Sequence, residues 1–160
     1  MNYQIRRFER SDANEVALVI AEVLRTVNIK DYSSEYIEEL INEITPEYLT
    51  RRAELTHFYV ACDMEKAEKI IGCGAIGPYF EREDESCLFT FFVLPEYQGR
   101  GVGRKIMETL ESDEFFLRAD RVEIPASITA VEFYRKMGYD YKDGIAALDE
   151  KQLYTLEKFR

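Results

Sequence analysis

Leu94–Glu108, LPEYQGRGVGRKIME, joins a proline turn to three closely spaced glycines and then to an amphipathic segment. Glycine is costly to order at a helix start, so Gly99, Gly101 and Gly103 require an explanation. Glycine lets backbone approach a ligand and lets successive N–H groups point the same way, and a helix start adds unpaired donors and partial positive charge. The stretch therefore predicts a phosphate-binding loop, with a plain strand-to-helix turn as the alternative.

The spacing of the glycines separates the known kinds of phosphate loop. A P-loop needs GxxxxGK followed by Ser or Thr, and no lysine stands in the required place after Gly103. The dinucleotide fingerprint GxGxxG fits Gly99 and Gly101 but meets Arg104 where glycine or alanine is needed, although Asp120 and Glu123 lie near the distance expected for a ribose-binding acid. That fingerprint would also leave only about 60 residues for a nucleotide-binding fold.

The elements on either side of the loop are a strand and a helix. Cys87–Leu94, CLFTFFVL, is almost wholly apolar, which is typical of a central strand buried on both faces. After the loop, one apolar face begins at or just after Gly101 and comprises Val102, Ile106, Met107 and Leu110. The local order is strand, glycine loop, helix.

Period-two and helical patterns predict the other elements. The expected strands are Tyr3–Phe8, His57–Cys62, Ile70–Ile76, Arg121–Ile124 ending at Pro125, Tyr139–Lys142 and Gln152–Lys158. The expected helices are one from a capping box of Asp12 and Glu15 through Val27, one from Ser33 or Ser34 to Ile44 with a short turn restarting at Pro46, and one from Ser127 to a glycine stop at Gly138. This mixture predicts an α/β or α+β fold with a mixed sheet in a single domain, 1–160.

Composition limits the possible functions. The formal net charge of -10 repels a phosphate backbone, which argues against nucleic acid as a partner. Cys62, Cys73 and Cys87 form no CxxC pair and stand in apolar surroundings, so we expect buried free thiols and no metal site. The N-terminal sequence has no signal-peptide pattern and no apolar run is long enough to span a membrane, so we expect a cytoplasmic protein that does not bind membranes.

A second motif follows the loop at a fixed distance. Gln98, Gly101 and Gly103 form QxxGxG after the strand, and about 25 residues later comes ASITAVEFYRKMGY, Ala126–Tyr139, with alanine, then FY, then a terminal GY. Together they resemble the two signatures of the GNAT family of acyl-CoA-dependent N-acyltransferases, and the order of the elements is similar over nearly the whole chain. The resemblance implies the GNAT fold, a mixed and mostly antiparallel sheet flanked by helices.

The resemblance also implies where a cofactor binds. Acetyl-CoA is expected to place its pyrophosphate on the backbone N–H groups of the loop and its pantetheine arm beside the central strand, where that strand separates from the next one. A backbone N–H there would face the thioester oxygen as an oxyanion hole. The implied cofactor-binding residues are Phe92, Val93, Leu94, Gln98, Gly99, Arg100, Gly101, Val102, Gly103, Arg104 and Ser127.

Two residues are implied to be catalytic. Tyr134 matches the family's tyrosine that protonates the departing thiolate, with a core aromatic as the alternative. Glu85 stands near the family position from which a base most often acts, although it also belongs to the acidic run EREDES. The family frequently has asparagine three residues before the helical alanine, where this chain has Ser127, and serine can still cap the helix.

The expected function is transfer of an acetyl group from acetyl-CoA to a primary amine by direct attack in a ternary complex. Acidic residues around Glu85 favour a cationic acceptor such as a polyamine, an aminoglycoside or a peptide amine. A non-catalytic acyl-CoA-binding or protein-interaction module on the same fold is the alternative. His57 is expected to be structural, and a homodimer through the last strands is possible.

Overall fold

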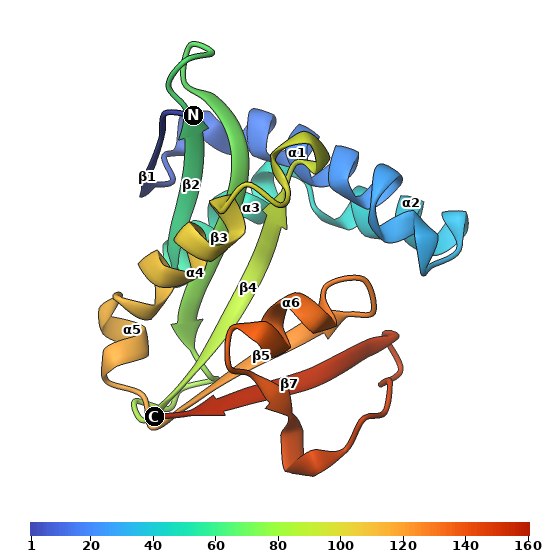
Figure 1. Ribbon diagram of the computed structural model, residues 1–160, viewed down its shortest axis with the longest axis vertical. Coiled ribbons are helices and arrows are strands. Elements are labelled where there is room, and N and C mark those ends of the chain that lie inside the picture. Colours follow the sequence, from blue (N-terminus) through green and yellow to red (C-terminus); the bar gives the residue numbers. More distant parts are fainter.

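The computed structural model describes residues 1–160 and contains one seven-stranded sheet with helices on both faces (Figure 1). The strands are β1 Tyr3–Arg7, β2 His57–Asp63, β3 Lys69–Pro78, β4 Glu85–Val93, β5 Arg121–Ser127, β6 Asp140–Tyr141 and β7 Leu153–Phe159. Their order across the sheet is β1-β2-β3-β4-β5-β7-β6, and every neighbouring pair is antiparallel except β4 and β5. The prediction of a mixed, mostly antiparallel sheet is confirmed.

Six α-helices cover this sheet. They are α1 Ala13–Thr26, α2 Ser34–Glu43, α3 Pro46–Leu55, α4 Val102–Glu111, α5 Glu114–Leu117 and α6 Val131–Lys136. In Figure 1, α1 and α3 lie behind the sheet, whereas α4 crosses in front of β2 and β3 and α6 lies in front of β5. None of the helices combines the length and the apolar composition that crossing a membrane requires.

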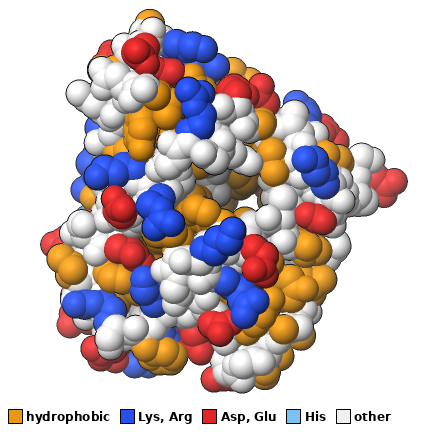
Figure 2. Space-filling model, in the orientation of Figure 1, with side chains coloured by type: hydrophobic (Ala, Val, Ile, Leu, Met, Phe, Trp, Pro, Cys, Tyr) orange, Lys and Arg blue, Asp and Glu red, His pale blue; other side chains and the backbone are white.

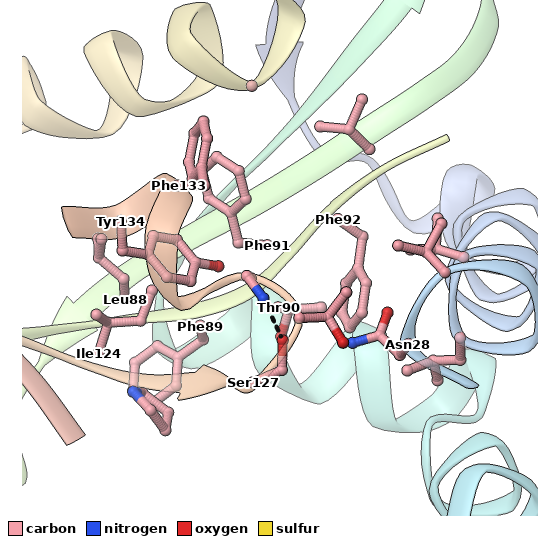
Figure 3. Close-up of a pocket in the computed structure, with 18 of the residues that line it drawn as sticks. Asn28, Leu88, Phe89, Thr90, Phe91, Phe92, Ile124, Ser127, Phe133 and Tyr134 are labelled. Carbon is pink, nitrogen blue, oxygen red and sulfur yellow. Dashed lines mark hydrogen bonds between the residues drawn. The ribbon is translucent and has the colours of Figure 1, made fainter. Parts of the chain in front are cut away.

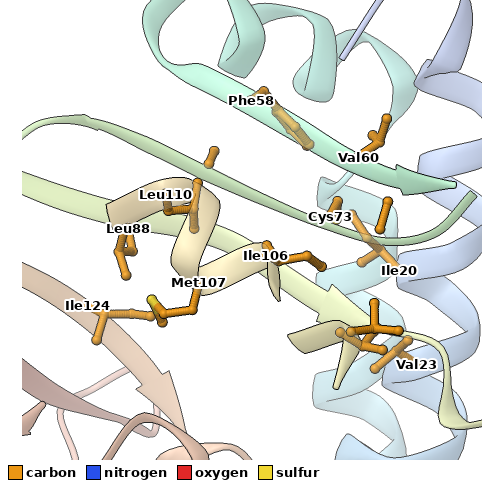
Figure 4. Packing of buried hydrophobic residues seen from close by; sticks show 14 of the residues in the cluster. Ile20, Val23, Phe58, Val60, Cys73, Leu88, Ile106, Met107, Leu110 and Ile124 are labelled. Carbon is orange, nitrogen blue, oxygen red and sulfur yellow. The ribbon is translucent and has the colours of Figure 1, made fainter. Parts of the chain in front are cut away.

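The core is made by apolar helix faces on both sides of the sheet. Ile106 and Leu110 of α4 are fully buried against one face, and Ile20 and Val23 of α1 are buried against the other (Figure 4). Burying one such side chain is worth about 1.5–3 kcal/mol. The predicted apolar faces of both helices are therefore confirmed, and they fix the central strands that carry the loop.

The predicted capping box at the start of α1 is wrong. The chain makes a 3₁₀ turn first, and Asp12 closes a box with Glu9, accepting the Glu9 N–H at 2.8 Å. Asp12 also accepts two hydrogen bonds from Arg6, at 2.8 and 2.9 Å. Glu15 instead accepts the Ile70 N–H at 2.7 Å, which ties α1 to β3.

Two predictions about prolines need correction. Pro46 begins a helix of 10 residues instead of a short turn, because Thr45 caps it by accepting the Tyr48 N–H at 3.1 Å and proline suits the first helical position. Pro125 does not end β5, which continues to Ser127 in register with β7. β5 pairs with β4 only as far as Glu123, so the edge of β5 that faces β4 has no partner strand at Pro125. The missing N–H of Pro125 therefore costs no hydrogen bond to β4. The short helix α5 was not predicted.

The edges of the sheet are β1 and β6. β6 is only two residues long, and it pairs with Leu156 and Glu157 of β7. A homodimer through these last strands stays a prediction.

Candidate active site

The sheet opens between β4 and β5. The two strands pair only at Glu85 with Arg121, Ser86 with Val122 and Cys87 with Glu123, and then diverge. From Leu88 onward, the backbone groups of β4 that face β5 have no partner in that strand. The predicted separation of these strands is confirmed.

A β-bulge bends β4 at the opening. Opposite Gly74 of β3, β4 carries two residues, Thr90 and Phe91. Thr90 has a φ of 51°, which is strained for a β-branched residue, and its carbonyl accepts a hydrogen bond from the Cys73 thiol at 3.2 Å. A bulge increases the local bend and twist of a strand, so it directs β4 away from β5.

A cavity of about 610 Å³ occupies the opening. Its walls come from β4, the end of β5, the loop after β4, α6 and the facing sides of α1, α2 and α3. In Figure 2 the central hollow has a hydrophobic floor and is bordered by Lys and Arg side chains. Three cations line the cavity and no carboxylate does; the cations are Arg52, Arg104 and Lys136.

The cavity has two sides, separated by β4. Phe91, Phe133 and Tyr134 lie on one side, with the Phe91 ring 5.5 Å from Phe133 and 5.7 Å from Tyr134 between centroids (Figure 3). Phe89 points to the other side, where the Arg52 guanidinium of α3 lies 4.3 Å from the centre of its ring. One side therefore faces α4 and α6, and the other faces α3.

The glycine loop supplies free backbone donors at one end of the cavity. The Gln98 N–H donates to Pro95 and the Lys105 N–H to Gly101, but the six N–H groups from Gly99 to Arg104 donate to no acceptor in the protein. The loop is held in place by the Gln98 side chain, whose Nε2 donates to the Val93 carbonyl at 2.9 Å. Six free donors at a helix start are a ready site for an anion.

The three glycines meet two different requirements. Gly99 and Gly101 have φ values of 72° and 87°, which favour glycine, and a Cβ at either position would meet nothing within 4 Å. Gly103 has ordinary helical backbone, and a Cβ there would lie 3.2 Å from the Phe133 ring. The first two therefore shape an open loop, and the third lets α4 and α6 pack closely.

Tyr134 lies on the cavity wall with its hydroxyl free of any protein partner. Its side chain is buried, and Figure 3 shows the hydroxyl pointing into the cavity. Burial, together with the nearby Cys73 thiol, raises the pKa of Tyr134 above that of an ordinary phenol. The hydroxyl is therefore a proton donor at neutral pH.

Ser127 lies at the end of β5 and also lines the cavity. Its hydroxyl accepts the Ala130 N–H at 3.2 Å and so stabilises the turn that leads into α6. The predicted helix start at Ser127 is wrong, because Ser127 ends β5 and α6 begins at Val131 with Ala130 as its N-cap. The predicted contact of Ser127 with a cofactor stays a prediction.

Glu85 is not brought to the cavity. It lies where β4 and β5 are still paired, and its carboxylate accepts from Arg121 and lies 2.9 Å from Nε of Arg82. None of the acidic residues 81–85 lines the cavity. The position of Glu85 gives no support to its predicted role as the base.

Three further predicted residues do not line the cavity with their side chains. Leu94 is buried in the core and donates its N–H to Ile71 at 2.9 Å, and Val102 is also buried. The Arg100 guanidinium is exposed and lies over the ring of Tyr97. The backbone N–H groups of Arg100 and Val102 are still free to bind an anion, whereas the N–H of Leu94 already donates to the Ile71 carbonyl.

His57 and the cysteines lie elsewhere, as expected. His57 bonds through Nδ1 to Asp113, at 2.7 and 2.9 Å, and does not line the cavity. All three cysteines are buried and free.

Sequence reasoning missed the residues on the α3 side of the cavity. Arg52 donates to the hydroxyl of Tyr48, one turn earlier on α3, and stacks on Phe89 of β4. The four-residue spacing of Tyr48 and Arg52 predicts that they share a helix face. No local signal indicates that this face meets β4.

The chain matches one protein family by sequence and several solved structures by fold. The model of the GNAT acetyltransferase domain matches residues 54–141, more than half of the chain, and no functionally curated protein matches the sequence. The crystal structure of PaiA N-acetyltransferase from Thermoplasma acidophilum, solved with coenzyme A, is 19% identical with a TM-score of 0.83, each chain being covered completely. A GCN5-related N-acetyltransferase from Rhodopseudomonas palustris is 21% identical with a TM-score of 0.78, covering 100% of this chain and 97% of that one. A GNAT-family acetyltransferase from Staphylococcus aureus Mu50 is 15% identical with a TM-score of 0.73, covering 99% of both chains. With its two signatures, its divided sheet and this match, the chain belongs to the GNAT family of acetyltransferases, enzymes that use acetyl-CoA as the acyl donor.

Proposed function

We propose that this acetyltransferase transfers the acetyl group to a primary amine by direct attack, with donor and acceptor bound together in the cavity between β4 and β5. The observation that carries the proposal is the run of six free N–H groups, Gly99 to Arg104, at one end of a cavity that also contains the Tyr134 hydroxyl. The run of N–H groups is suited to binding a diphosphate, and the Tyr134 hydroxyl is suited to protonating a leaving thiolate.

The residues present fit coenzyme A. The open loop has no Cβ at Gly99 or Gly101 that would obstruct a phosphate, and Arg104 and Lys136 add positive charge to the same cavity. Beside the loop, the unpaired edge of β4 from Leu88 to Val93 offers backbone groups to an extended amide-containing arm. The pyrophosphate and the arm would thus be bound largely by backbone.

Bound acetyl-CoA supplies the thioester carbonyl. A backbone N–H on the open edge of β4 would stabilise the negative charge that develops on the carbonyl oxygen. In the proposed reaction the amine nitrogen would form the new C–N bond as the C–S bond breaks. Tyr134 would give its proton to the departing sulfur and regain one from solvent, and the proton released by the amine would pass to water.

The acceptor amine would have to enter in its neutral form, because no carboxylate lines the cavity to deprotonate it. An alkylammonium has a pKa near 10.4 and an α-amino group one near 8, so at neutral pH a far larger fraction of α-amino groups is neutral. This difference favours peptide or amino-acid amines as acceptors over polyamines and aminoglycosides.

Calorimetry with coenzyme A tests the proposed loop. Gly101→Ala should weaken binding by roughly 10-fold or more, since alanine at a φ of 87° is strained and distorts the donors. Gly144→Ala is the matched control, because Gly144 has a φ of 72° and open surroundings but lies outside the cavity. Equal affinities in both variants would contradict the proposed binding mode.

Turnover is tested by acetyl-CoA-dependent thiol release over a panel of primary amines. Release that requires an amine would support transfer by direct attack. Tight binding of coenzyme A without release by any amine would favour the binding module instead.

A further inference from the structure

Arg52 is a cation without a counter-charge inside the cavity. Its guanidinium forms no ion pair, its Nε is buried without a hydrogen-bond partner, and its one bonded group is the neutral Tyr48 hydroxyl. Arg121, which also packs against an aromatic ring, contacts three carboxylates, those of Glu85, Glu123 and Glu157. Arg52 is only partly exposed, and its Nε is the one buried side-chain nitrogen or oxygen without a hydrogen-bond partner, which costs free energy.

The setting of Arg52 prepares it for an anion. Its guanidinium lies 4.3 Å from the centre of the Phe89 ring and 5.3 Å from that of Tyr48. The two rings restrict the guanidinium, and only one of its nitrogens donates to a protein acceptor, the Tyr48 hydroxyl. The remaining N–H groups form a planar fork that matches a carboxylate in two-point contact. Apolar walls around it strengthen such a contact by excluding water.

Arg52 also lies on the side of the cavity that the proposed donor site leaves free. The loop donors, Phe133 and Tyr134 lie with α4 and α6, whereas Arg52 belongs to α3 and stacks on Phe89. Phe89 and Phe91, which packs on Tyr134, flank the bulge at Thr90, and both line the same cavity as Arg52 and Tyr134. A small molecule can therefore reach from Arg52 to the reaction centre.

We infer that Arg52 binds a carboxylate of the acceptor, so that the substrate is a primary amine that also carries a carboxylate. The inference rests on the proposed function, because it assigns the α3 side of the same cavity to the acceptor. It reverses the expectation of a cationic acceptor from the acidic run, which lies away from the cavity.

Three matched amines test the selectivity. 4-Aminobutyrate, n-butylamine and 1,4-diaminobutane have the amine on similar chains that end in a carboxylate, a methyl group and an ammonium group. An amino acid and its amide form a second pair with an α-amine. We expect kcat/KM to favour the carboxylate member by about 10- to 100-fold, the range for hydrogen bonds to a charged group. Equal rates, or preference for the diamine, would overturn the inference.

Two neighbouring arginines provide the test and its control. Arg52→Gln should reduce the carboxylate preference to about 3-fold or less, and Arg52→Lys should retain part of it because the charge remains. Arg51→Gln removes the same charge from an exposed position outside the cavity and should retain the full preference. Full preference in Arg52→Gln would refute the role of Arg52.

Binding decides the question even without turnover. Calorimetry on the coenzyme A complex should show tighter binding of 4-aminobutyrate than of n-butylamine, and Arg52→Gln should remove the difference. Carboxylate-selective binding without turnover would contradict the proposed function and support this inference. Turnover of all the amines without selectivity would support the proposed function and contradict this inference.

Discussion

Tyr134 has a buried ring and a reactive hydroxyl. The ring packs edge-on against Phe91 and Phe133, which fixes it in place, whereas the hydroxyl has no protein partner and faces the cavity. Because burial keeps the phenol protonated, its role as an acid does not depend on a neighbouring residue.

Tyr134→Phe should therefore separate catalysis from folding. We expect kcat to fall by roughly 100-fold, the usual contribution of a positioned acid, with the affinity for coenzyme A changed by less than about 3-fold. Because no protein hydrogen bond is lost, the free energy of unfolding should change by less than about 1 kcal/mol. Steady-state kinetics and urea unfolding measure the three quantities.

Tyr154→Phe is the control for this substitution, since it removes a hydroxyl from another packed tyrosine that does not line the cavity. It should leave kcat within about 2-fold of the original enzyme. An unchanged kcat in Tyr134→Phe would contradict the proposal that Tyr134 protonates the departing thiolate.

The sequence indicates some of these residues and not others, for a physical reason. Gly99 and Gly101 are recognisable because a loop built from adjacent residues carries its own pattern, and Tyr134 because it belongs to a helix of fixed spacing. No local pattern indicates that Arg52 lines the cavity, because its position there depends on contact with Phe89, a residue distant in the chain. Glu85 was predicted by position alone, and its pairing with Arg121 depends on the register of two strands.

At the scale of the elements, helix starts depend on contacts outside the helix. The start of α1 is fixed by Arg6 of β1 and by the Glu9 N–H, which together hold the Asp12 carboxylate. Burial works against ionisation of this group, but the hydrogen bonds from Arg6 and Glu9 outweigh it and lower the pKa of Asp12 below 3.8.

The stability contributed by Asp12 should depend on pH in one direction. A carboxylate with a lowered pKa stabilises the fold above its unfolded pKa of about 3.8, and this contribution is lost as the pH falls further. Asp12→Asn should lower the free energy of unfolding by about 1–3 kcal/mol at pH 7, and by less at pH 3.

Urea unfolding at both pH values measures this difference. Asp143→Asn, at an exposed position whose side chain contacts no cation, removes the same charge and should change the free energy by less than about 0.5 kcal/mol at either pH. An Asp12→Asn deficit that is equal at pH 7 and pH 3 would show that its ionisation is not involved.

Element boundaries were predicted where local chemistry decides them. Ser33 caps α2, and Gly138, with a φ of 99°, follows α6, as the sequence indicates. Local rules gave the wrong result where a neighbour was decisive. Proline normally ends a strand, yet Pro125 is accepted in β5 because β4 has already turned away.

At the scale of the whole molecule, the sheet consists of two parts with a short connection. β1–β4 and β5–β7 share three residue pairs at one end. At the open end Tyr32 provides a second link, donating to the Gln152 carbonyl at 2.7 Å and accepting the Ile128 N–H at 2.9 Å. The cavity lies between these two connections.

Coenzyme A bound across this opening should stabilise the entire fold. A ligand at 100 times its dissociation constant adds about 2.7 kcal/mol to the free energy of unfolding, which for a chain of this size raises Tm by roughly 5–10 °C. Scanning calorimetry with increasing coenzyme A measures the rise. Gly101→Ala should need more coenzyme for the same shift, and no shift at saturation would mean that binding does not require the folded cavity.

The burial of the three cysteines has a practical consequence for following the reaction. Cys62, Cys73 and Cys87 are at most 6% exposed, and burial raises the pKa values of Cys73 and Cys87 to about 12. Disulfide and alkylating reagents attack thiolates that they can reach, so the native enzyme presents them with almost no target. A chromogenic disulfide added during turnover would consequently record the liberated cofactor alone, in real time, without poisoning the catalyst.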